Sequence, residues 1–168
     1  MRKLLIITLL FLILLPWIRS DAKKKTLTFE EAIEESSEGF FEITQKILEK
    51  YKQFNEDVKL LAEVIYHENW YTDKDKLTAY WTGAVVMNRV HSDEWPDTVY
   101  GVLYQKGQYS TTKKFFTVEL PDEVYDMARD ILINGTPDVP ENVVFQSMNP
   151  KLGKKIWKSL NGEYFAYG

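Results

Sequence analysis

Residues 61–68 read LAEVIYHE, an apolar stretch that closes on a histidine and a glutamate. In a helix, residues three, four and seven positions apart share one face, and here that face carries Leu61, Val64, Ile65 and Glu68. A carboxyl group withdrawn from water is more readily protonated near neutral pH, which is what a general acid requires. The pattern therefore predicts an amphipathic helix that aims a candidate catalytic acid, Glu68, along its buried face. The competing interpretation is a partly exposed glutamate at a helix end.

Three helices are expected within residues 55–168, which we interpret as the main domain. Asn55 is a favourable N-cap followed by two acids, so the helix that carries Glu68 is predicted to begin there. A second helix, over residues 76–90, has an inward face made of Leu77, Trp81, Ala84, Val85 and Asn88. A third, over residues 121–134, is followed by Gly135, the residue type that most favours a helix C-cap.

Two short strands are predicted near the C-terminus. Residues 142–146 and 163–167 are rich in β-branched and aromatic side chains, and the second segment follows an Asn161-Gly162 turn. We expect these strands to pair. The fold class is therefore α+β, mostly α, with a short β-hairpin.

An amphipathic helix is expected to precede the main domain. Thr28-x-x-Glu31 has the spacing of a capping box, and apolar residues then recur every seven positions, at Ile33, Phe40, Ile47 and Phe54. This pattern predicts a helical stalk over residues 23–54, which Gly39 could interrupt. Its apolar stripe, within residues 29–54, is a candidate surface for the main domain or for a protein partner.

The N-terminus has the features of an export signal. Two basic residues are followed by an apolar run over residues 4–18, shorter than the roughly 20 residues that span a bilayer. Small residues at positions 20 and 22 predict cleavage after Ala22, which makes residues 1–22 a signal peptide. The alternative is an uncleaved anchor, which would be the only contact with a membrane. Either interpretation predicts a secreted or otherwise extracytoplasmic protein.

The composition excludes several classes of function. The chain of 168 residues carries a net charge of -4, so it has no basic excess for a nucleic-acid backbone, and no nucleic-acid partner is expected. It contains no cysteine, which excludes disulfides, thiol nucleophiles and thiolate metal sites. His67-Glu68 lacks the second histidine of a zinc-protease helix, because Tyr71 stands in its place. With His91 the only other histidine, no metal and no cofactor is expected.

A few other side chains could contact a ligand. Asn88 is either a buried structural amide that ties loop backbone together or a substrate contact, and the structural role is favoured. Gln108, Tyr109 and Ser110 offer an amide, a ring and a hydroxyl in one predicted loop. The ring of Trp70, one of several aromatic residues nearby, would suit sugar stacking if exposed, although most such rings belong to cores.

The order of these pieces resembles that in the SleB/CwlJ cell wall hydrolase family of spore cortex-lytic enzymes. The resemblance covers roughly residues 56–168, and its most specific piece is Ala84-Val85-Val86-Met87-Asn88-Arg89-Val90. It implies a compact lysozyme-like fold that cleaves peptidoglycan glycan strands between N-acetylmuramic acid and N-acetylglucosamine. The family's catalytic acid falls on Glu68. Sugar contacts would come from Gln108, Tyr109, Ser110, Gln146 and Trp70, with Asn88 in a supporting role.

The sequence departs from this family at the acid itself. The family often has Glu-Ala-Arg-Gly-Glu there, whereas this chain has Glu68-Asn69-Trp70-Tyr71-Thr72, so the second family acid is missing from its usual place. Asp73 or Asp75 could replace it. A lytic transglycosylase needs only one carboxyl group, and this favours the anhydro-forming reaction over hydrolysis by two carboxylates. The alternatives are an N-acetylmuramoyl-L-alanine amidase that depends on a metal, and a non-catalytic wall-binding or assembly protein.

Overall fold

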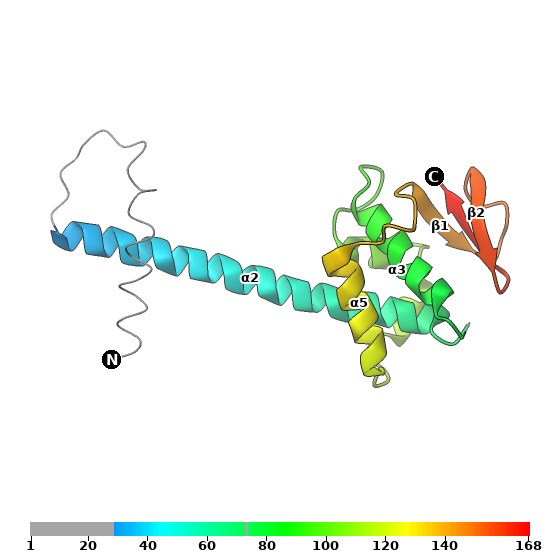
Figure 1. Ribbon diagram of the computed structural model, residues 1–168, viewed down its shortest axis with the longest axis horizontal. Helices are drawn as coiled ribbons and strands as arrows, with labels where there is room; N and C mark the ends of the chain where they lie inside the picture. The colour runs from blue at the N-terminus through cyan, green and yellow to red at the C-terminus, as the bar shows by residue number, and fades with distance from the viewer. Residues whose placement is uncertain (1–28, 73) are drawn as a thin grey trace. The chain divides into compact units, whose positions relative to one another are not determined.

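The computed structural model describes residues 29–72 and 74–168 (Figure 1). Within these residues the chain forms four α-helices, one 3-10 helix and one three-stranded sheet, which confirms the predicted α+β, mostly α class. In chain order they are α2 (Phe29–Asn69), α3 (Leu77–Val90), α4 (Val99–Tyr104), η1 (Ser110–Lys114), α5 (Asp122–Asn134), β1 (Val143–Ser147), β2 (Lys155–Leu160) and β3 (Glu163–Tyr167). The chain divides into two units, Met1–Ile47 and Leu48–Gly168. The expected export signal, residues 1–22, lies outside the described residues.

Helix α2 is one uninterrupted helix of 41 residues, so the prediction of a new helix start at Asn55 is wrong. The Nδ2 atom of Asn55 donates a hydrogen bond to the Tyr51 carbonyl oxygen, 2.9 Å away and one turn earlier. The side chain therefore bonds back along the helix instead of capping a new one. Gly39 does not interrupt the helix either.

The first part of α2 presents large apolar side chains to solvent. Ile33, Phe40 and Ile47, three members of the heptad pattern, are 49%, 66% and 61% exposed. Whether this stripe binds a protein partner stays a prediction. Within residues 29–72 and 74–168, no helix is both long enough and apolar enough to span a membrane.

The core of the second unit lies between the end of α2, α3 and α5. Leu61, Val64 and Ile65 are completely buried, which confirms the predicted inward face of α2. On α3, four of the five predicted inward residues are buried, but Leu77 is 44% exposed because it is the first residue of the helix. Helix α5 ends where predicted, at Gly135 with a φ of 71°.

The sheet has the strand order β1-β3-β2, with both pairings antiparallel (Figure 1). The predicted pairing of β1 with β3 is confirmed. Strand β2 was not predicted, because most of its side chains are exposed and its three polar residues hide the strand pattern. Asn161 and Gly162, with φ of 53° and 82°, form the tight turn between β2 and β3, as expected where both central residues need positive φ. Helices α4 and η1 were not predicted, and Ser110, which was expected in a loop, is the first residue of η1.

Gly83 sets how closely α3 packs on its neighbours. A Cβ atom at this position would lie 2.5 Å from Ile131 Cδ1 on α5 and 3.1 Å from Ile65 Cδ1 on α2. We expect Gly83→Val to lower the free energy of unfolding by about 1–3 kcal/mol, because overpacking forces both helices apart. Urea unfolding followed by circular dichroism measures this change. Gly39→Ala is the control, since a Cβ there meets nothing within 4 Å; an equal loss in both variants would contradict the packing argument.

Candidate functional site

Glu68 lies in the last turn of α2 and is half-buried. Its Oε1 atom accepts a hydrogen bond from the Oγ1 atom of Thr111, 2.5 Å away. Thr111 belongs to η1, 43 positions further along the chain. Thr111 was not predicted, because a threonine beside a loop carries no signal of its own. The bond fixes one carboxyl oxygen of Glu68, and the other forms no hydrogen bond within residues 29–72 and 74–168, so it can take a proton or a ligand.

A second carboxyl group, Glu163, lies close enough to Glu68 for their charges to interact. Glu163 is the first residue of β3, and its Oε1 atom accepts a hydrogen bond from Gln146 Nε2 at 2.9 Å. Burial raises the pKa of Glu163, and the charge of Glu68 raises it further, whereas hydrogen bonds with Gln146 and Asn69 lower it. The structure thus brings Gln146, a predicted substrate residue, to a carboxyl group that was not predicted.

Tyr109 lies beside both carboxyl groups. Its side chain is 9% exposed, and its hydroxyl is buried without a hydrogen-bond partner among the described residues. Burial raises the pKa of Tyr109 to about 12, and the charges of Glu68 and Glu163 act in the same direction, while Arg89 opposes them. The phenol is therefore neutral at ordinary pH and has a free hydrogen-bonding group next to the carboxyl pair.

Arg89 is a buried cation on the other side of Tyr109. It is 3% exposed, and its Nε atom donates to the Val144 carbonyl oxygen at 2.7 Å. Its guanidinium carbon lies 4.2 Å from the ring centre of Trp95 and 5.4 Å from that of Tyr109. Burial lowers the pKa of Arg89, and the neighbouring Tyr109 opposes this. Neighbouring Asn88 donates to the carbonyl oxygens of Pro140 and Val143, as a structural amide would.

Asn69, directly after Glu68, links several elements of the site. It is 2% exposed, and its Nδ2 atom donates to Thr82 Oγ1 on α3 at 2.7 Å. Its Oδ1 atom accepts from Thr72 Oγ1 at 2.9 Å. Together with its hydrogen bond to Glu163, these contacts hold the end of α2 against α3 and β3.

The remaining predicted ligand contacts differ in how far they are exposed to solvent. Gln108 and Ser110, on either side of Tyr109, are exposed and accessible to a ligand. Trp70 is only 7% exposed, and the ammonium group of Lys76 lies 4.6 Å from its ring centre. A sugar could stack on this ring only after Lys76 moved.

The histidines do not join this cluster. His67 Nε2 lies 3.2 Å from Glu63 Oε2, and its ring stacks on Phe115 with centroids 5.9 Å apart. His91 is exposed. Within residues 29–72 and 74–168, no three histidine, aspartate or glutamate side chains are grouped as a metal ion would require. Of the two aspartates considered as second acids, Asp75 is exposed, and Asp73 lies outside the described residues.

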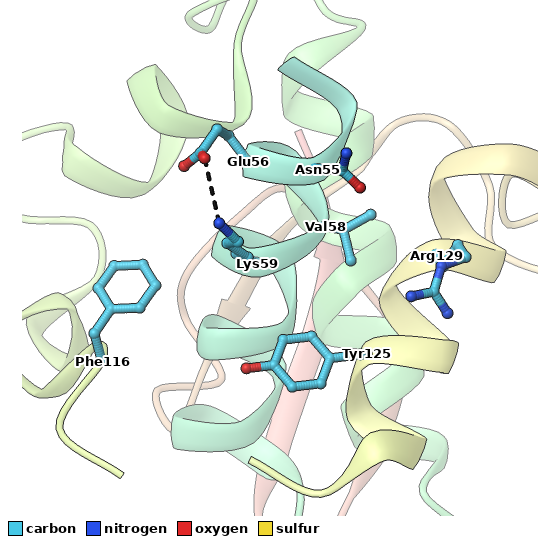
Figure 2. A pocket seen from close by; sticks show the side chains of 7 residues that line it. All are labelled: Asn55, Glu56, Val58, Lys59, Phe116, Tyr125 and Arg129. Atoms are coloured by element: carbon cyan, nitrogen blue, oxygen red, sulfur yellow. Dashed lines mark hydrogen bonds and ion pairs between the residues drawn. The ribbon is translucent and has the colours of Figure 1, made fainter. Parts of the chain in front are cut away.

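A shallow pocket lies apart from this centre (Figure 2). Its lining comes from α2, around Lys59, from α5, which supplies Tyr125 and Arg129, and from exposed Phe116. Both cations have partners, since Lys59 pairs with Glu56 at 3.3 Å and Arg129 pairs with Asp126 at 2.7 Å. None of the predicted catalytic or sugar-binding residues lines this pocket.

Most enzymes that cleave glycosidic bonds use a pair of carboxyl groups. The family described as Cell Wall Hydrolase matches residues 75–166, which is more than half of the chain. The chain belongs to this family, the SleB/CwlJ-type domain family, as the sequence resemblance led us to expect. The matched region contains Thr111, Gln146 and Glu163 and begins after Glu68.

No curated protein matches the chain significantly. No solved structure matches it significantly either.

The raised pKa of Glu163 predicts how stability depends on pH. The folded state binds the proton of Glu163 more tightly than the unfolded chain does. Ionisation of Glu163 therefore lowers the free energy of unfolding as the pH rises from the ordinary carboxyl pKa, about 4.3, through the raised pKa. Glu163→Gln removes this titration and its repulsion with Glu68. We expect the thermal midpoint of the variant, relative to that of the wild type, to rise between about pH 4 and pH 8. Exposed Glu119→Gln controls for loss of a charge; a difference that shrinks with rising pH would contradict the assignment.

Proposed function

We propose that this protein cleaves the glycan strands of peptidoglycan outside the cytoplasm, with Glu68 as the general acid and then the general base. Membership of the Cell Wall Hydrolase family supports a hydrolase that acts on the cell wall. The observation that carries the finer assignment is the half-buried carboxyl group of Glu68, held through one oxygen by Thr111. A positioned carboxyl group with one free oxygen can give a proton to a leaving group and take one back.

The reaction needs one proton to move in each direction. Protonated Glu68 gives its proton to the glycosidic oxygen, and the bond between that oxygen and the anomeric carbon of N-acetylmuramic acid breaks. In the lytic transglycosylase reaction, the 6-hydroxyl group of the same sugar attacks the anomeric carbon and loses its proton to the Glu68 carboxylate. The product then ends in 1,6-anhydro-muramic acid, and the enzyme returns to its starting protonation state.

Glu163 favours hydrolysis as a second candidate reaction. We inferred the anhydro-forming reaction from the absence of a second acid near Glu68 in the sequence, but Glu163 interacts electrostatically with Glu68. A second carboxyl group close to Glu68 completes the pair that hydrolysis requires, in which one group gives a proton to the leaving oxygen and the other activates a water molecule. In that case the product would have a reducing end.

The exposure of each predicted residue indicates which side chains could contact the substrate. Gln108 and Ser110 are exposed and would hydrogen-bond sugar hydroxyl or N-acetyl groups. Tyr109 stays a candidate contact, but its hydroxyl is buried and would reach a sugar only after its surroundings opened. Gln146 would act mainly through Glu163, which it already contacts. Trp70 stays a candidate for sugar stacking. An N-terminal export signal would bring the domain to this substrate.

Glu68→Gln should reduce glycan cleavage by about 100-fold to 10,000-fold, because an amide cannot transfer the proton. The measurement is mass spectrometry of the fragments released from purified peptidoglycan, with exposed Glu119→Gln as the matched control. Anhydro ends that disappear in Glu68→Gln would support the transglycosylase, and reducing ends would support hydrolysis with Glu163.

Two results would contradict this proposal. Stem peptides freed from intact glycan, with activity lost on chelation or on substitution of His67 or His91, would identify an amidase. Folded protein that binds peptidoglycan but releases no fragments at any pH would leave a non-catalytic binding role.

Thr111→Val should lower kcat by about 10-fold to 100-fold, since a hydrogen bond to a charged group contributes about 1.5–3 kcal/mol. Thr111→Ser keeps the hydroxyl and should retain most of the activity. Steady-state rates of fragment release measure both variants. Equal losses in the two variants would mean that Thr111 acts through packing and not through its bond to Glu68.

A further inference from the structure

The segment of residues 147–160 is a basic surface in an acidic chain. It contains four lysines and no aspartate or glutamate, whereas the whole chain has a net charge of -4. The four lysines, at positions 151, 154, 155 and 158, are all exposed. Strand β2, which carries two of them, is an edge strand of the sheet and pairs only with β3. This edge can therefore attract anionic groups that the rest of the surface would repel.

Lys158 has a more defined position than the other lysines. Its Nζ atom lies 4.6 Å from the ring centre of Trp157 and 5.3 Å from that of Trp81. In the part of the chain that the structure describes, it forms no ion pair with a carboxylate. Aromatic faces therefore hold the ammonium group in place, while its N–H donors stay available to an external acceptor.

The sheet register places Lys158 near the carboxyl pair. Lys158 is paired with Phe165, and Leu160 is paired with Glu163, so the two cross-strand positions are two residues apart, about 7 Å along the strand. Glu163 and Phe165 point to the same face of β3, because side chains alternate along a strand. The contact of Lys158 with Trp81 on α3 places its ammonium on the side of the sheet that packs against α3, where Phe165 is buried.

We propose that Lys158, supported by the Trp157 and Trp81 rings, binds a carboxylate of the stem peptide attached to the glycan strand being cleaved. This inference rests on the proposed function and extends it to the substrate class: the enzyme would prefer glycan that still bears its peptides. Stem peptides carry free carboxylates and branch from the same muramic acid residues that the reaction involves. A cation two residues along the sheet from the position of Glu163 is placed to recognise such a branch.

Lysines on an edge strand also have a simpler role, since they prevent sheets from joining edge to edge. Lys155, the first residue of β2, fits that role. This role does not explain the position of Lys158, whose ammonium group lies against two tryptophan rings. A lysine that only protects an edge needs no such contacts.

The test compares binding and cleavage of two substrates by the full chain. Lys158→Met keeps the stem on the tryptophan rings and removes the charge, Lys158→Arg keeps the charge, and Lys151→Gln is the matched control at an exposed lysine outside β2. The substrates are purified peptidoglycan freed of phosphate-containing polymers, and the same glycan after enzymatic removal of its stem peptides. Binding is measured by co-sedimentation in a Glu68→Gln background, and cleavage by KM and kcat.

We expect Lys158→Met to weaken binding to peptide-bearing glycan about fivefold, to raise KM to the same extent and to leave kcat unchanged. Binding to stripped glycan should not change, and Lys158→Arg and Lys151→Gln should behave like the parent chain. Thermal midpoints identify any variant that fails to fold.

Equal losses on both substrates, or no loss on either, would overturn the proposal. A loss seen only with peptidoglycan that retains its phosphate-containing polymers would also overturn it and assign the edge to those polymers. Co-sedimentation is measured in the Glu68→Gln variant, so it tests the contact of Lys158 with the stem peptide even if the protein cleaves no glycan. Failure of the proposed reaction and failure of this inference are therefore distinguishable.

Discussion

Two polar side chains at the end of α3 hold the backbone that leads into the sheet, and the geometry of the site depends on them. Arg89 donates to the carbonyl oxygen of Val144, 55 positions away, and Asn88 donates to two carbonyl oxygens just before that point. Buried carbonyl groups need such donors, because an unpaired one costs about as much as a lost hydrogen bond. With β1 held on α3, β3 follows by pairing, and Glu163 at the start of β3 is brought to Glu68.

The site therefore combines groups that are unfavourable together. Two carboxyl groups interact across a partly buried space, and a tyrosine hydroxyl lies beside them without a partner among the described residues. The hydrogen bonds that Glu163 receives from Gln146 and Asn69 offset part of this cost, as the bond from Thr111 does for Glu68. Unfavourable electrostatics of this kind is typical of functional sites, where the surrounding fold supplies the compensating stability.

The elements that sequence could predict are those with a local cause. Apolar residues with the 3.6-residue period of a helix predicted α3, α5 and the buried face that ends in Glu68. The Asn161-Gly162 pair predicted a turn, because a tight turn needs two residues with positive φ angles. The failures also have local causes: Asn55 can cap a helix or bond back within one, and β2 is an edge strand whose side chains are mostly exposed. Thr111 and Glu163 were missed for another reason. Their significance arises only from long-range contacts, which no local pattern encodes.

The position of the acid raises a final structural question, since Glu68 precedes the residues that match the family. The last turns of α2 are nevertheless part of the same core: Leu61, Val64 and Ile65 are completely buried, and Ile65 Cδ1 lies 3.1 Å from where a Cβ atom on Gly83 of α3 would stand. Asn69 then bonds to Thr82 on α3 and to Glu163 on β3. The acid is thus oriented by the matched region through packing on one side and hydrogen bonds on the other. Its placement depends on these contacts of α2 with α3 and β3, at a point where Gly83 carries no side chain.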